Sequence, residues 1–413
     1  MTALRPSVTV VCPFAGSVDE ARQIATQLLT IVFRPGDELL IVDNTPEQNV
    51  LRAALPAPIS VVSAEQQQSS YFARNQGARV ATASWVLFID ADCVPTPTLL
   101  DDYFAQPVPD RCGAIAGAVL STDIDSSIVS RYATVRQVLD QTHVLHHPFR
   151  PYAATANLLV RMEAFAMVGG FHEGIRSAGD ADFCWRLQEA GWTLEYRPDA
   201  VVRHEHRTSA AGLWRQFARY GAGATWLRRR HGAPSTHSLG PRRLTQLVAG
   251  PFLALARRHP DDAVLRCLDV WVEAANLVGS VASNRAPAGR DDTPAVVIAA
   301  ATYPDTTVEA LVKELEDDGQ RVIVSAAGRG MPVIRRPWTE VFYDDDDSPV
   351  DRVRGAGWSI VRSGRGFSRL ASTARALSRR DVTAVRASGQ PGTRERAAEL
   401  ARLLRVPEVT GGR

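Results

Sequence analysis

The feature that most constrains the fold is a regular alternation of apolar runs with helix-like segments near the start of the chain. The predicted elements are buried strands at 7–14, 37–46, 59–67 and 84–95, and helices at 18–32 and 71–83. Strands that alternate with helices form a parallel sheet whose faces the helices cover. The sequence therefore predicts an α/β fold, with a ligand crevice beyond the carboxyl ends of the strands.

Three aspartates stand where these predicted strands end. Asp43 closes the second strand, and Asp90 and Asp92 follow the apolar run of the fourth. The carboxyl ends of parallel strands meet at one edge of a sheet, so these carboxylates should converge there. Two carboxylates one residue apart can hold a divalent cation through oxygen ligands. The alternative is an Asx turn, which is common after a strand.

Length, charge and cysteines narrow the class of protein. With 413 residues, 45% of them apolar, the chain suits two or three domains. A net charge of +2 argues against binding of a polyanion by the whole chain. Five scattered cysteines without a C-x-x-C pair favour neither disulfides nor zinc. No signal peptide or bilayer-spanning run is evident, so a cytoplasmic location is expected.

Several ordered motifs occur between residues 7 and 230. They are IVDNTP at 41–46, ARNQGAR at 73–79, DAD at 90–92, TANLLVRMEAFAMVGGFHE at 155–173, SAGDADFCWRLQEAGW at 177–192, VVRHEHR at 201–207 and RQFARYG at 215–221. In this order they resemble the motifs of the family-2 inverting glycosyltransferases, which have the GT-A fold. The resemblance implies transfer of a sugar from a nucleotide diphosphate, with uridine diphosphate as the expected leaving group, to an acceptor that the sequence does not identify.

The resemblance also implies a donor site. Asp43 takes the place of the acid that recognises the base, Arg74 and Asn75 lie near the nucleoside, and Asp90 faces the ribose. Phe14, Asn157 and Arg219 are the other residues expected at the donor. Arginine suits a diphosphate because its planar fork forms paired hydrogen bonds, although a solvated helix arginine is an equal alternative for Arg219.

The same resemblance implies metal ligands and a general base. Asp92 and His204 are the expected ligands of Mn²⁺ or Mg²⁺, with His206 as the fallback. Asp180 is the expected general base for the attacking hydroxyl. Its alternative role is the N-cap of the following helix, and Asp182 could be the acid that complements the helix dipole.

Two positions depart from the family pattern. Gly179 stands where a glutamate is usual, so a role in positioning the acceptor is vacant or supplied elsewhere. Tyr220 replaces the tryptophan of processive members, so polymer synthesis is not supported. On the acceptor side we expect Asp182 and Trp185.

The segment 203–258 contains eleven arginines and one acid, Glu205. A membrane-surface patch at the inner face of the membrane, a site for an anionic acceptor and a solvated face are the competing interpretations. Nucleic acid is disfavoured because no nucleic-acid-binding fold is recognisable.

The remaining chain predicts two further units. The domains expected are a GT-A domain at 1–235, a helical linker module at 236–290 and a smaller α/β domain at 291–413. In the module, a helix near 262–283 carries one narrow polar stripe, so most of its surface should be buried, and 283–295 should be a linker. A membrane-interface helix is the less favoured alternative.

The C-terminal domain resembles a degenerate copy of the first. Segments 71–95 and 367–391 align without a gap, which places Arg386 at Asp90 and Ser388 at Asp92, and Ser325 replaces Asp43. We expect strands at 295–301, 321–325 and 382–387 to lie in the order of the first domain. This unit should carry no metal and serve packing, homodimer formation or acceptor capture. The acid run 344–347 is interpreted as a solvated loop.

Overall fold

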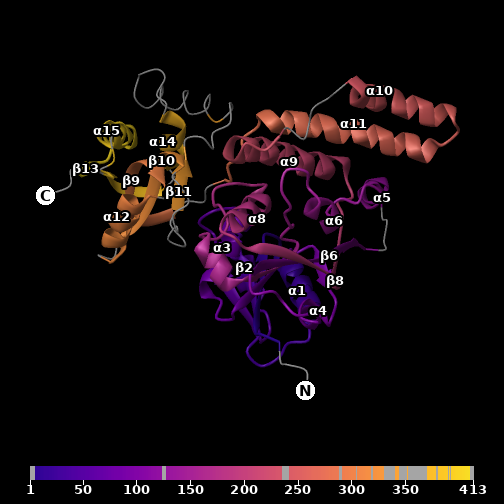
Figure 1. The fold of residues 1–413 in the computed structure, drawn as a ribbon, viewed down its shortest axis with the longest axis horizontal. Coiled ribbons are helices and arrows are strands. Elements are labelled where there is room, and N and C mark those ends of the chain that lie inside the picture. Colours follow the sequence, from indigo (N-terminus) through magenta and orange to yellow (C-terminus); the bar gives the residue numbers. More distant parts are fainter. Residues whose placement is uncertain are drawn as a thin grey trace.

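The computed structural model describes most of the chain. The described residues are 5–122, 127–234, 241–287, 291–303, 305–317, 320–329, 340–343, 351, 370–377, 380–388, 390 and 392–409. The acid run 344–347 and much of the segment 367–391 lie outside these ranges. The described part contains two sheets and a layer of long helices (Figure 1).

The N-terminal sheet has eight strands in the order β3-β2-β1-β4-β7-β6-β8-β5. Their bounds are β1 Val8–Phe14, β2 Glu38–Asp43, β3 Ile59–Ser63, β4 Trp85–Ile89, β5 Cys93–Pro95, β6 Cys112–Ser121, β7 Asn157–Arg161 and β8 Thr193–His204. The β3-β2-β1-β4 half is parallel, as predicted. Strand β7 runs antiparallel to β4 and β6, so the whole sheet is mixed.

Helices cover both faces of this sheet. They are α1 Val18–Leu28, α2 Asn49–Arg52, α3 Ser70–Val80, α4 Leu99–Tyr103, α5 Ile128–Val135, α6 Gln141–Leu145, α7 Met162–Met167 and α8 Gly179–Glu189. One core cluster packs α1 against the sheet, and another packs α3, α7 and α8 against the opposite face. Burial of these apolar side chains is the main force that holds the layers together.

The single strand predicted at 84–95 is two strands. β4 ends at Ile89, and β5 begins at Cys93 and pairs with β8 at the far edge of the sheet. The residues between them, 90–92, leave the ladder because the amide of Cys93 closes a turn onto the carbonyl of Asp90. The D-x-D motif is therefore the corner between two parts of one sheet.

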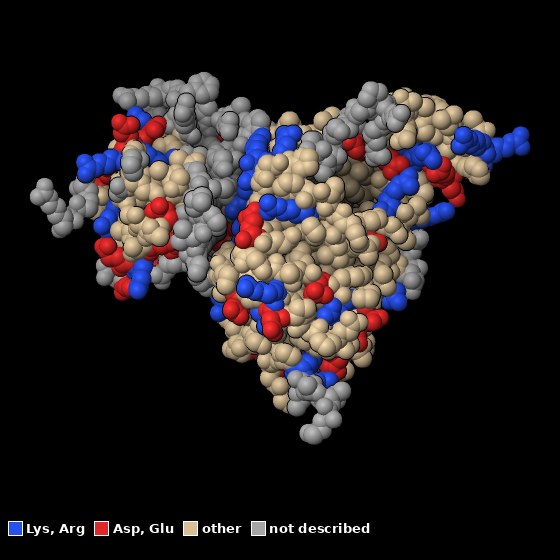
Figure 2. Space-filling view, viewed as in Figure 1, with Lys and Arg blue, Asp and Glu red and all other residues tan. Residues whose placement is uncertain are grey.

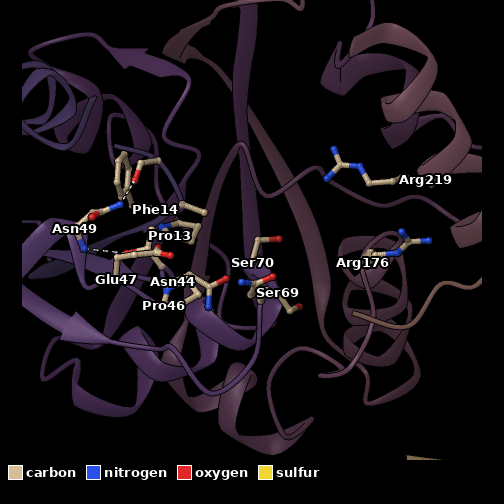
Figure 3. A pocket seen from close by; sticks show the side chains of 14 residues that line it. Pro13, Phe14, Asn44, Pro46, Glu47, Asn49, Ser69, Ser70, Arg176 and Arg219 are labelled. Atoms are coloured by element: carbon tan, nitrogen blue, oxygen red, sulfur yellow. Dashed lines mark hydrogen bonds between the residues drawn. The ribbon is translucent and has the colours of Figure 1, made fainter. Parts of the chain in front are cut away.

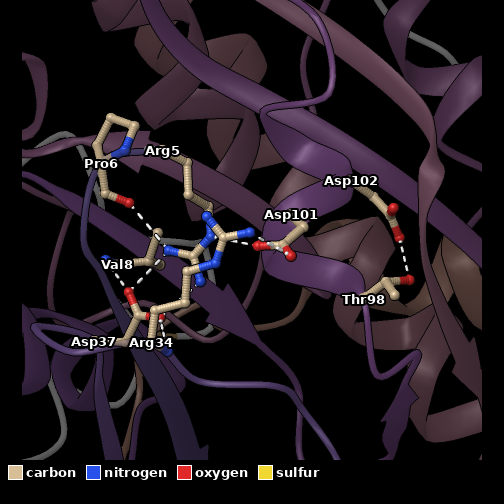
Figure 4. A network of polar contacts seen from close by, with 8 residues as sticks. All are labelled: Arg5, Pro6, Val8, Arg34, Asp37, Thr98, Asp101 and Asp102. Atoms are coloured by element: carbon tan, nitrogen blue, oxygen red, sulfur yellow. Dashed lines mark hydrogen bonds and ion pairs between the residues drawn. The ribbon is translucent and has the colours of Figure 1, made fainter. Parts of the chain in front are cut away.

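An ion network ties the start of the chain to the domain (Figure 4). The Arg5 guanidinium contacts Asp37 and Asp101, each at 2.7 Å, and Arg34 contacts Asp101 at 2.8 Å. Burial disfavours the charge on Arg5, but its two carboxylate partners outweigh that effect and raise its pKa. The side chain of Asp37 is fully buried, so this pairing fixes the entry to β1.

Three long helices form the next layer: α9 Ala210–His231, α10 Pro241–Ala256 and α11 Pro260–Val281. α9 and α11 cross very closely, because Gly221 of α9 faces the backbone of Asn276 and Gly279 of α11 faces that of Ala218. A Cβ at Gly221 would lie 2.1 Å from the Asn276 carbonyl oxygen, so only glycine permits this approach.

The expectation that α11 is buried on most sides is wrong. Its apolar side chains Trp271, Leu277 and Val278 are 42–59% exposed, whereas the stripe residues Asp269 and Asn276 face the protein. Neighbouring α10 is exposed in the same way, with Phe252 at 72%. The side of α11 that faces the domain is mixed. Leu265 and Val272 pack there in an apolar cluster, and Asp269 pairs with Arg136 at the end of α5.

The linker predicted at 283–295 is only partly a linker. Its first residues pair with the segment before α8, since Arg176 donates its amide to the carbonyl of Asn284 and Ala286 donates to that of Gly174. Its last residues already belong to strand β9, Asp291–Tyr303.

The second sheet is parallel and has five strands, ordered β11-β10-β9-β12-β13. The other strands are β10 Arg321–Arg329, β11 Glu340–Tyr343, β12 Arg380–Ala387 and β13 Glu408–Val409, with helices α12 Thr306–Asp317, α14 Ala371–Leu377 and α15 Thr393–Leu404. The predicted order is confirmed, because β11-β10-β9-β12 repeats β3-β2-β1-β4. Doubly wound folds in general share this order, so it agrees with duplication without establishing it.

Candidate active site

The larger cavity, of about 530 Å³, lies beyond the carboxyl ends of β1 and β2. Its lining comprises residues 13–16, Asn44, Thr45, Pro46, Glu47, Asn49, Gln68, Ser69, Ser70, Arg176 and Arg219. Phe14 and Arg219, two of the residues that the sequence analysis expects at the donor, both line this cavity. Figure 3 shows Arg176 and Arg219 on the side opposite Phe14 and Asn49.

Asp43 holds the loop that forms one wall of this cavity. One carboxylate oxygen accepts from the Thr45 amide at 3.0 Å and its hydroxyl at 2.6 Å, and the other accepts from the Val50 amide at 2.6 Å. The side chain is 2% exposed. Both oxygens are therefore occupied in folding the loop 44–49, and the structure places Asp43 behind the cavity wall instead of against a base.

The D-x-D corner separates two carboxylates. Asp90 is held by Arg74 of α3, whose side chain is buried. Asp92 turns toward the end of β8, where its Oδ1 lies 3.4 Å from His204 Nε2 and its Oδ2 lies 3.4 Å from Arg207. Burial opposes the charge on Asp92, but His204 and Arg207 outweigh it and hold its pKa below the usual range.

The Asp92–His204 pair fits part of a cation site. A carboxylate and an imidazole from two elements face each other, and the other ring nitrogen of His204 is buried without a hydrogen-bond partner among the described residues. His206 instead contacts the Ser121 hydroxyl at 2.8 Å, so His204 is the better candidate. No group of three or more His, Cys, Asp or Glu side chains in the described part of the chain is placed to hold a metal ion by itself. Two protein ligands suffice where substrate phosphates and water complete the shell.

Asp180 lies at the start of α8 in a second cavity of about 340 Å³. Its Oδ1 accepts the Ala181 amide at 3.0 Å. Burial raises the pKa of Asp180, and the backbone hydrogen bond and the charge of Arg74 only partly offset it. The N-cap position belongs to Ala178, so Asp180 is not the cap. A half-buried carboxylate with a raised pKa suits proton abstraction.

The two cavities share a wall. Three pairs of consecutive residues each contribute one member to either cavity: Ser70 and Tyr71, Arg176 and Ser177, and Arg219 and Tyr220. The two cavities therefore lie next to each other.

Tyr71 explains the glycine at 179. A Cβ at Gly179 would lie 2.8 Å from three atoms of the Tyr71 ring. The ring therefore occupies the space that a longer side chain at 179 would need. Tyr71 also lines the second cavity beside Asp180.

Two residues expected at the donor are committed elsewhere. Asn157 is fully buried, accepting from the Tyr103 hydroxyl at 2.7 Å and donating to the carbonyls of Ala118 and Ala200. Asn75 donates to Glu173 at 2.7 Å and accepts the Phe171 amide at 2.9 Å. Their side chains stabilise the sheet and the loop before α8, and neither residue lines the larger cavity.

The two residues expected on the acceptor side, Asp182 and Trp185, lie in different surroundings. Asp182 is fully buried and pairs with Arg186 and His231, each at 2.9 Å, and with Arg230. It therefore anchors α8 to the end of α9 and does not reach the second cavity. Trp185 does line that cavity, and its indole N–H donates a hydrogen bond to the carbonyl of Arg150 at 3.1 Å.

Several residues of these cavities were not predicted. Arg176 gave no signal because it lies in an irregular segment, and its position depends on the pairing with 283–286. Asn276 lines the second cavity from α11, with its Oδ1 buried and without a hydrogen-bond partner among the described residues. The polar stripe marked Asn276, but sequence could not tell which face of α11 meets the domain.

Comparison with known proteins decides the family. The model of "Glycosyl transferase family 2" matches residues 9–155, and that of "Glycosyl transferase family group 2" matches residues 85–276. The chain belongs to glycosyltransferase family 2. Its N-terminal part is accordingly a GT-A domain with a mixed sheet, accompanied by a second, smaller parallel sheet.

Curated relatives are similar over the same part. The pre-mycofactocin glycosyltransferase of Mycobacterium tuberculosis is 30% identical over 231 residues, 54% of this chain and 48% of that protein. The glycosyltransferase AglE of Haloferax volcanii is 25% identical over 224 residues, 52% of this chain and 73% of that protein. The chain thus spans about half the length of the mycobacterial relative.

Two solved structures show the extent of the structural likeness. A mannosyltransferase from Pyrobaculum calidifontis, in complex with GDP-Man and Mn²⁺, is 18% identical with a TM-score of 0.47, covering 67% of this chain and 88% of its own. Glucosyl-3-phosphoglycerate synthase from Mycobacterium tuberculosis, with Mn²⁺, UDP and phosphoglyceric acid, is 15% identical with a TM-score of 0.40, covering 56% and 81%.

Proposed function

We propose that the protein is an inverting glycosyltransferase that moves a hexose from a nucleotide-diphosphate sugar to an acceptor hydroxyl. Family membership supports this, and the observation that carries it is the shared wall. The larger cavity holds Arg176 and Arg219, and the smaller one holds Asp180 with its raised pKa. Guanidinium groups for a diphosphate in one cavity and a base in the cavity next to it suit an in-line displacement where the two cavities meet.

In this mechanism the base and the donor lie on different elements. Asp180 accepts the proton of the acceptor hydroxyl as the oxygen attacks the anomeric carbon, and the bond to the diphosphate breaks on the opposite face. Burial keeps the Asp180 carboxylate a stronger base than a solvated aspartate. Its fixed place at the first turn of α8 holds it at the acceptor side.

The donor is held from both sides of the larger cavity. The loop 44–49, shaped by Asp43, and Phe14 lie at the nucleoside end in this proposal, and the guanidinium of Arg219 faces the diphosphate. Arg74 pairs with Asp90 and holds it in place at the corner. Uridine diphosphate is the leaving group that the motif resemblance favours.

Asp92 and His204 would hold Mn²⁺ or Mg²⁺ between the D-x-D corner and the end of β8. A cation bound there neutralises the charge that develops on the diphosphate. His204 Nε2 and Asp92 Oδ1 already face each other across 3.4 Å, so these side chains need no large rearrangement to share a ligand.

A thermal-shift panel tests this function. UDP-glucose, UDP-galactose, UDP-N-acetylglucosamine and GDP-mannose are each added with and without Mn²⁺. A shift for one donor that requires Mn²⁺ supports the proposal, because a ligand that binds the folded state raises its melting temperature. Donor binding without release of the nucleoside diphosphate, when acceptors with free hydroxyls are also supplied, would support the other candidate, a sugar-nucleotide-binding protein that retains the fold.

We also propose that the enzyme works in the cytoplasm against the inner face of a membrane. No helix within the described residues is long and apolar enough to cross a bilayer. The hairpin of α10 and α11 nevertheless exposes many large apolar side chains, among them Leu244, Val248, Phe252 and Leu255 of α10 and Leu277, Val278 and Val281 of α11. Arg257 and Arg258 are exposed at the turn of the hairpin, and Figure 2 shows basic side chains at the tip of this arm. Apolar and basic side chains together suit anionic lipid headgroups.

Vesicles provide the test of the hairpin. The protein should sediment with phosphatidylcholine vesicles containing phosphatidylserine and much less with phosphatidylcholine alone. Phe252→Asp should weaken this binding, and Gln246→Asp, the same charge change at an exposed polar position of α10, should not. A stable dimer that Phe252→Asp dissociates, without vesicle binding, would show that a second copy covers this face instead.

A further inference from the structure

The second cavity has a composition that restricts its ligand. Most of its described lining is aliphatic or aromatic, with Trp185, Phe217 and Leu227 among the larger apolar side chains. The residues with polar groups are Ser177, Asp180, Asn276, His147, Tyr71, Tyr152 and Tyr220. Among the described residues of this lining, Asp180 is the one acid and none is a lysine or arginine. Such walls favour a ligand with an apolar body and few polar groups.

The aromatic walls are fixed before any ligand binds. Trp185 packs edge-on against Phe149 at 5.0 Å and against Tyr152 at 6.3 Å, and its ring lies 6.0 Å from that of His147. Its indole N–H is held by the carbonyl of Arg150. Burial lowers the pKa of His147, so its ring is neutral at neutral pH. The aromatic side chains on this side of the cavity are therefore fixed in place and uncharged.

Asn276 adds a second polar point. The close crossing of α9 and α11 at Gly221 brings this residue to the cavity, where it is 5% exposed. Its Oδ1 is buried and has no hydrogen-bond partner among the described residues. A buried acceptor without a partner is rare and costs free energy, so a donor group on a ligand would satisfy it.

We infer that the acceptor is a hydroxylated compound with an apolar, ring-containing body, and that it is not a sugar. This inference rests on the proposed function, because it assigns the acceptor side of the same site. The reacting hydroxyl lies at Asp180, the rings stack against Trp185 and Tyr152, and a second donor of the acceptor meets Asn276 Oδ1.

Size and polarity both favour this class. A cavity of about 150 Å³ holds benzene, so about 340 Å³ accommodates two rings. A sugar carries a hydroxyl on most of its carbons, whereas most of the described lining is hydrocarbon and would leave several of them without a partner. Hydroxyls left unpaired after desolvation oppose binding.

Binding is tested first, without any donor. The probes are 2-naphthol, a set of dihydroxynaphthalenes and methyl β-glucoside, and the readout is isothermal titration calorimetry. We expect 2-naphthol to bind and methyl β-glucoside not to bind at millimolar concentration. Ala224→Phe, which fills the cavity, should weaken naphthol binding by about tenfold or more, and Ala211→Phe, on the exposed side of the same helix, should not. Ala233→Phe narrows the same cavity and replaces Ala224→Phe if that variant does not fold.

The role of Asn276 is tested by the second hydroxyl. At least one dihydroxynaphthalene should bind more tightly than 2-naphthol, and Asn276→Leu should remove that advantage while 2-naphthol itself still binds. An advantage that survives in Asn276→Leu would refute the second contact. Naphthol binding that is absent, or equal in wild type and Ala224→Phe, would overturn the acceptor class.

Transfer from each nucleotide sugar then separates the two proposals. Glycosylated naphthol, detected by mass spectrometry, supports both. Transfer to methyl β-glucoside without naphthol binding would retain the glycosyltransferase function and overturn the acceptor class. Naphthol binding with no release of nucleoside diphosphate from any donor, even with Mn²⁺, would count against the glycosyltransferase and leave an apolar binding site.

Discussion

Replacement of Asp180 by asparagine removes one negative charge and little else. The side chains have the same shape, and the amide oxygen can still accept the hydrogen bond that Ala181 donates at 3.0 Å. Asp180 does not line the larger cavity, so donor affinity should change by about twofold at most. The amide cannot take a proton from the acceptor, and the turnover number should therefore carry the whole effect.

The magnitude follows from the share of a general base. Such a group contributes roughly 10²–10⁴ in rate, equivalent to about 3–5 kcal/mol of transition-state stabilisation. Burial raises the pKa of Asp180 in the folded state, so wild-type kcat should fall with decreasing pH at a higher pH than an ordinary aspartate would give. This acidic limb should be missing from the residual activity of Asp180→Asn.

Stability provides the matching control. An acid whose pKa is raised on folding binds its proton more tightly in the folded state, so the stability it contributes is complete below its unfolded pKa and is lost as pH rises through the folded pKa. At neutral pH the wild type bears the cost of this buried charge. Asp180→Asn should then melt at the same temperature as the wild type or higher.

The assay measures release of nucleoside diphosphate, kcat and KM separately, for the wild type, Asp180→Asn and the exposed surface variant Asp199→Asn. A wild-type kcat in Asp180→Asn would remove this residue from the mechanism. A loss that appears only in KM for the donor would also refute the reasoning, because it would place Asp180 at the nucleotide.

Three further variants test other parts of the site. Asp92→Asn should abolish Mn²⁺-dependent donor binding in calorimetry, because it removes a charged ligand without changing shape; undiminished binding would show that another residue holds the cation. Asp182→Asn should cost about 3–5 kcal/mol in urea unfolding, because it leaves buried cations unpaired. In the wild type, burial opposes the charge on Asp182, but those cations outweigh burial and lower the pKa of Asp182. The stability that Asp182 provides should therefore be lost as pH falls below about 4. Gly221→Val should separate α9 from α11 and lower the melting temperature, since its Cβ would lie 2.1 Å from the Asn276 carbonyl oxygen; an unchanged temperature would contradict the close crossing.

The part of the site that follows strand ends could be predicted from sequence. Asp92 and His204 lie far apart in the chain, yet they meet at 3.4 Å because β5 and β8 pair at Cys93 and His204. Ordered motifs at strand ends carry this information, since a doubly wound sheet brings its carboxyl ends to one edge. The parallel order of β1, β2, β3 and β4 was predictable for the same reason.

Side-chain direction could not be predicted in the same way. Asn157 also stands at a strand boundary, but its side chain points into the sheet's interior and meets Tyr103. Successive residues of a strand face opposite sides, so a shift of one residue decides between the crevice and the core. Asp43 faces the crevice end, yet backbone amides of its own loop take both of its oxygens. The sequence does not show which hydrogen-bond donors the carboxylate of Asp43 meets.

Helix α11 shows why a hydrophobic pattern alone does not orient an element. Periodicity separates a polar from an apolar face, and the usual inference buries the apolar one. Here the face that packs inward is mixed, because Asp269 pairs with Arg136 and Gly221 leaves room for the backbone of Asn276, next to the buried Leu265 and Val272. The same rotation leaves Trp271 and Leu277 exposed. One helix thereby supplies a polar point to the inner cavity and an apolar face to the outside, so the acceptor class and the membrane surface can be tested by substitutions on opposite sides of it.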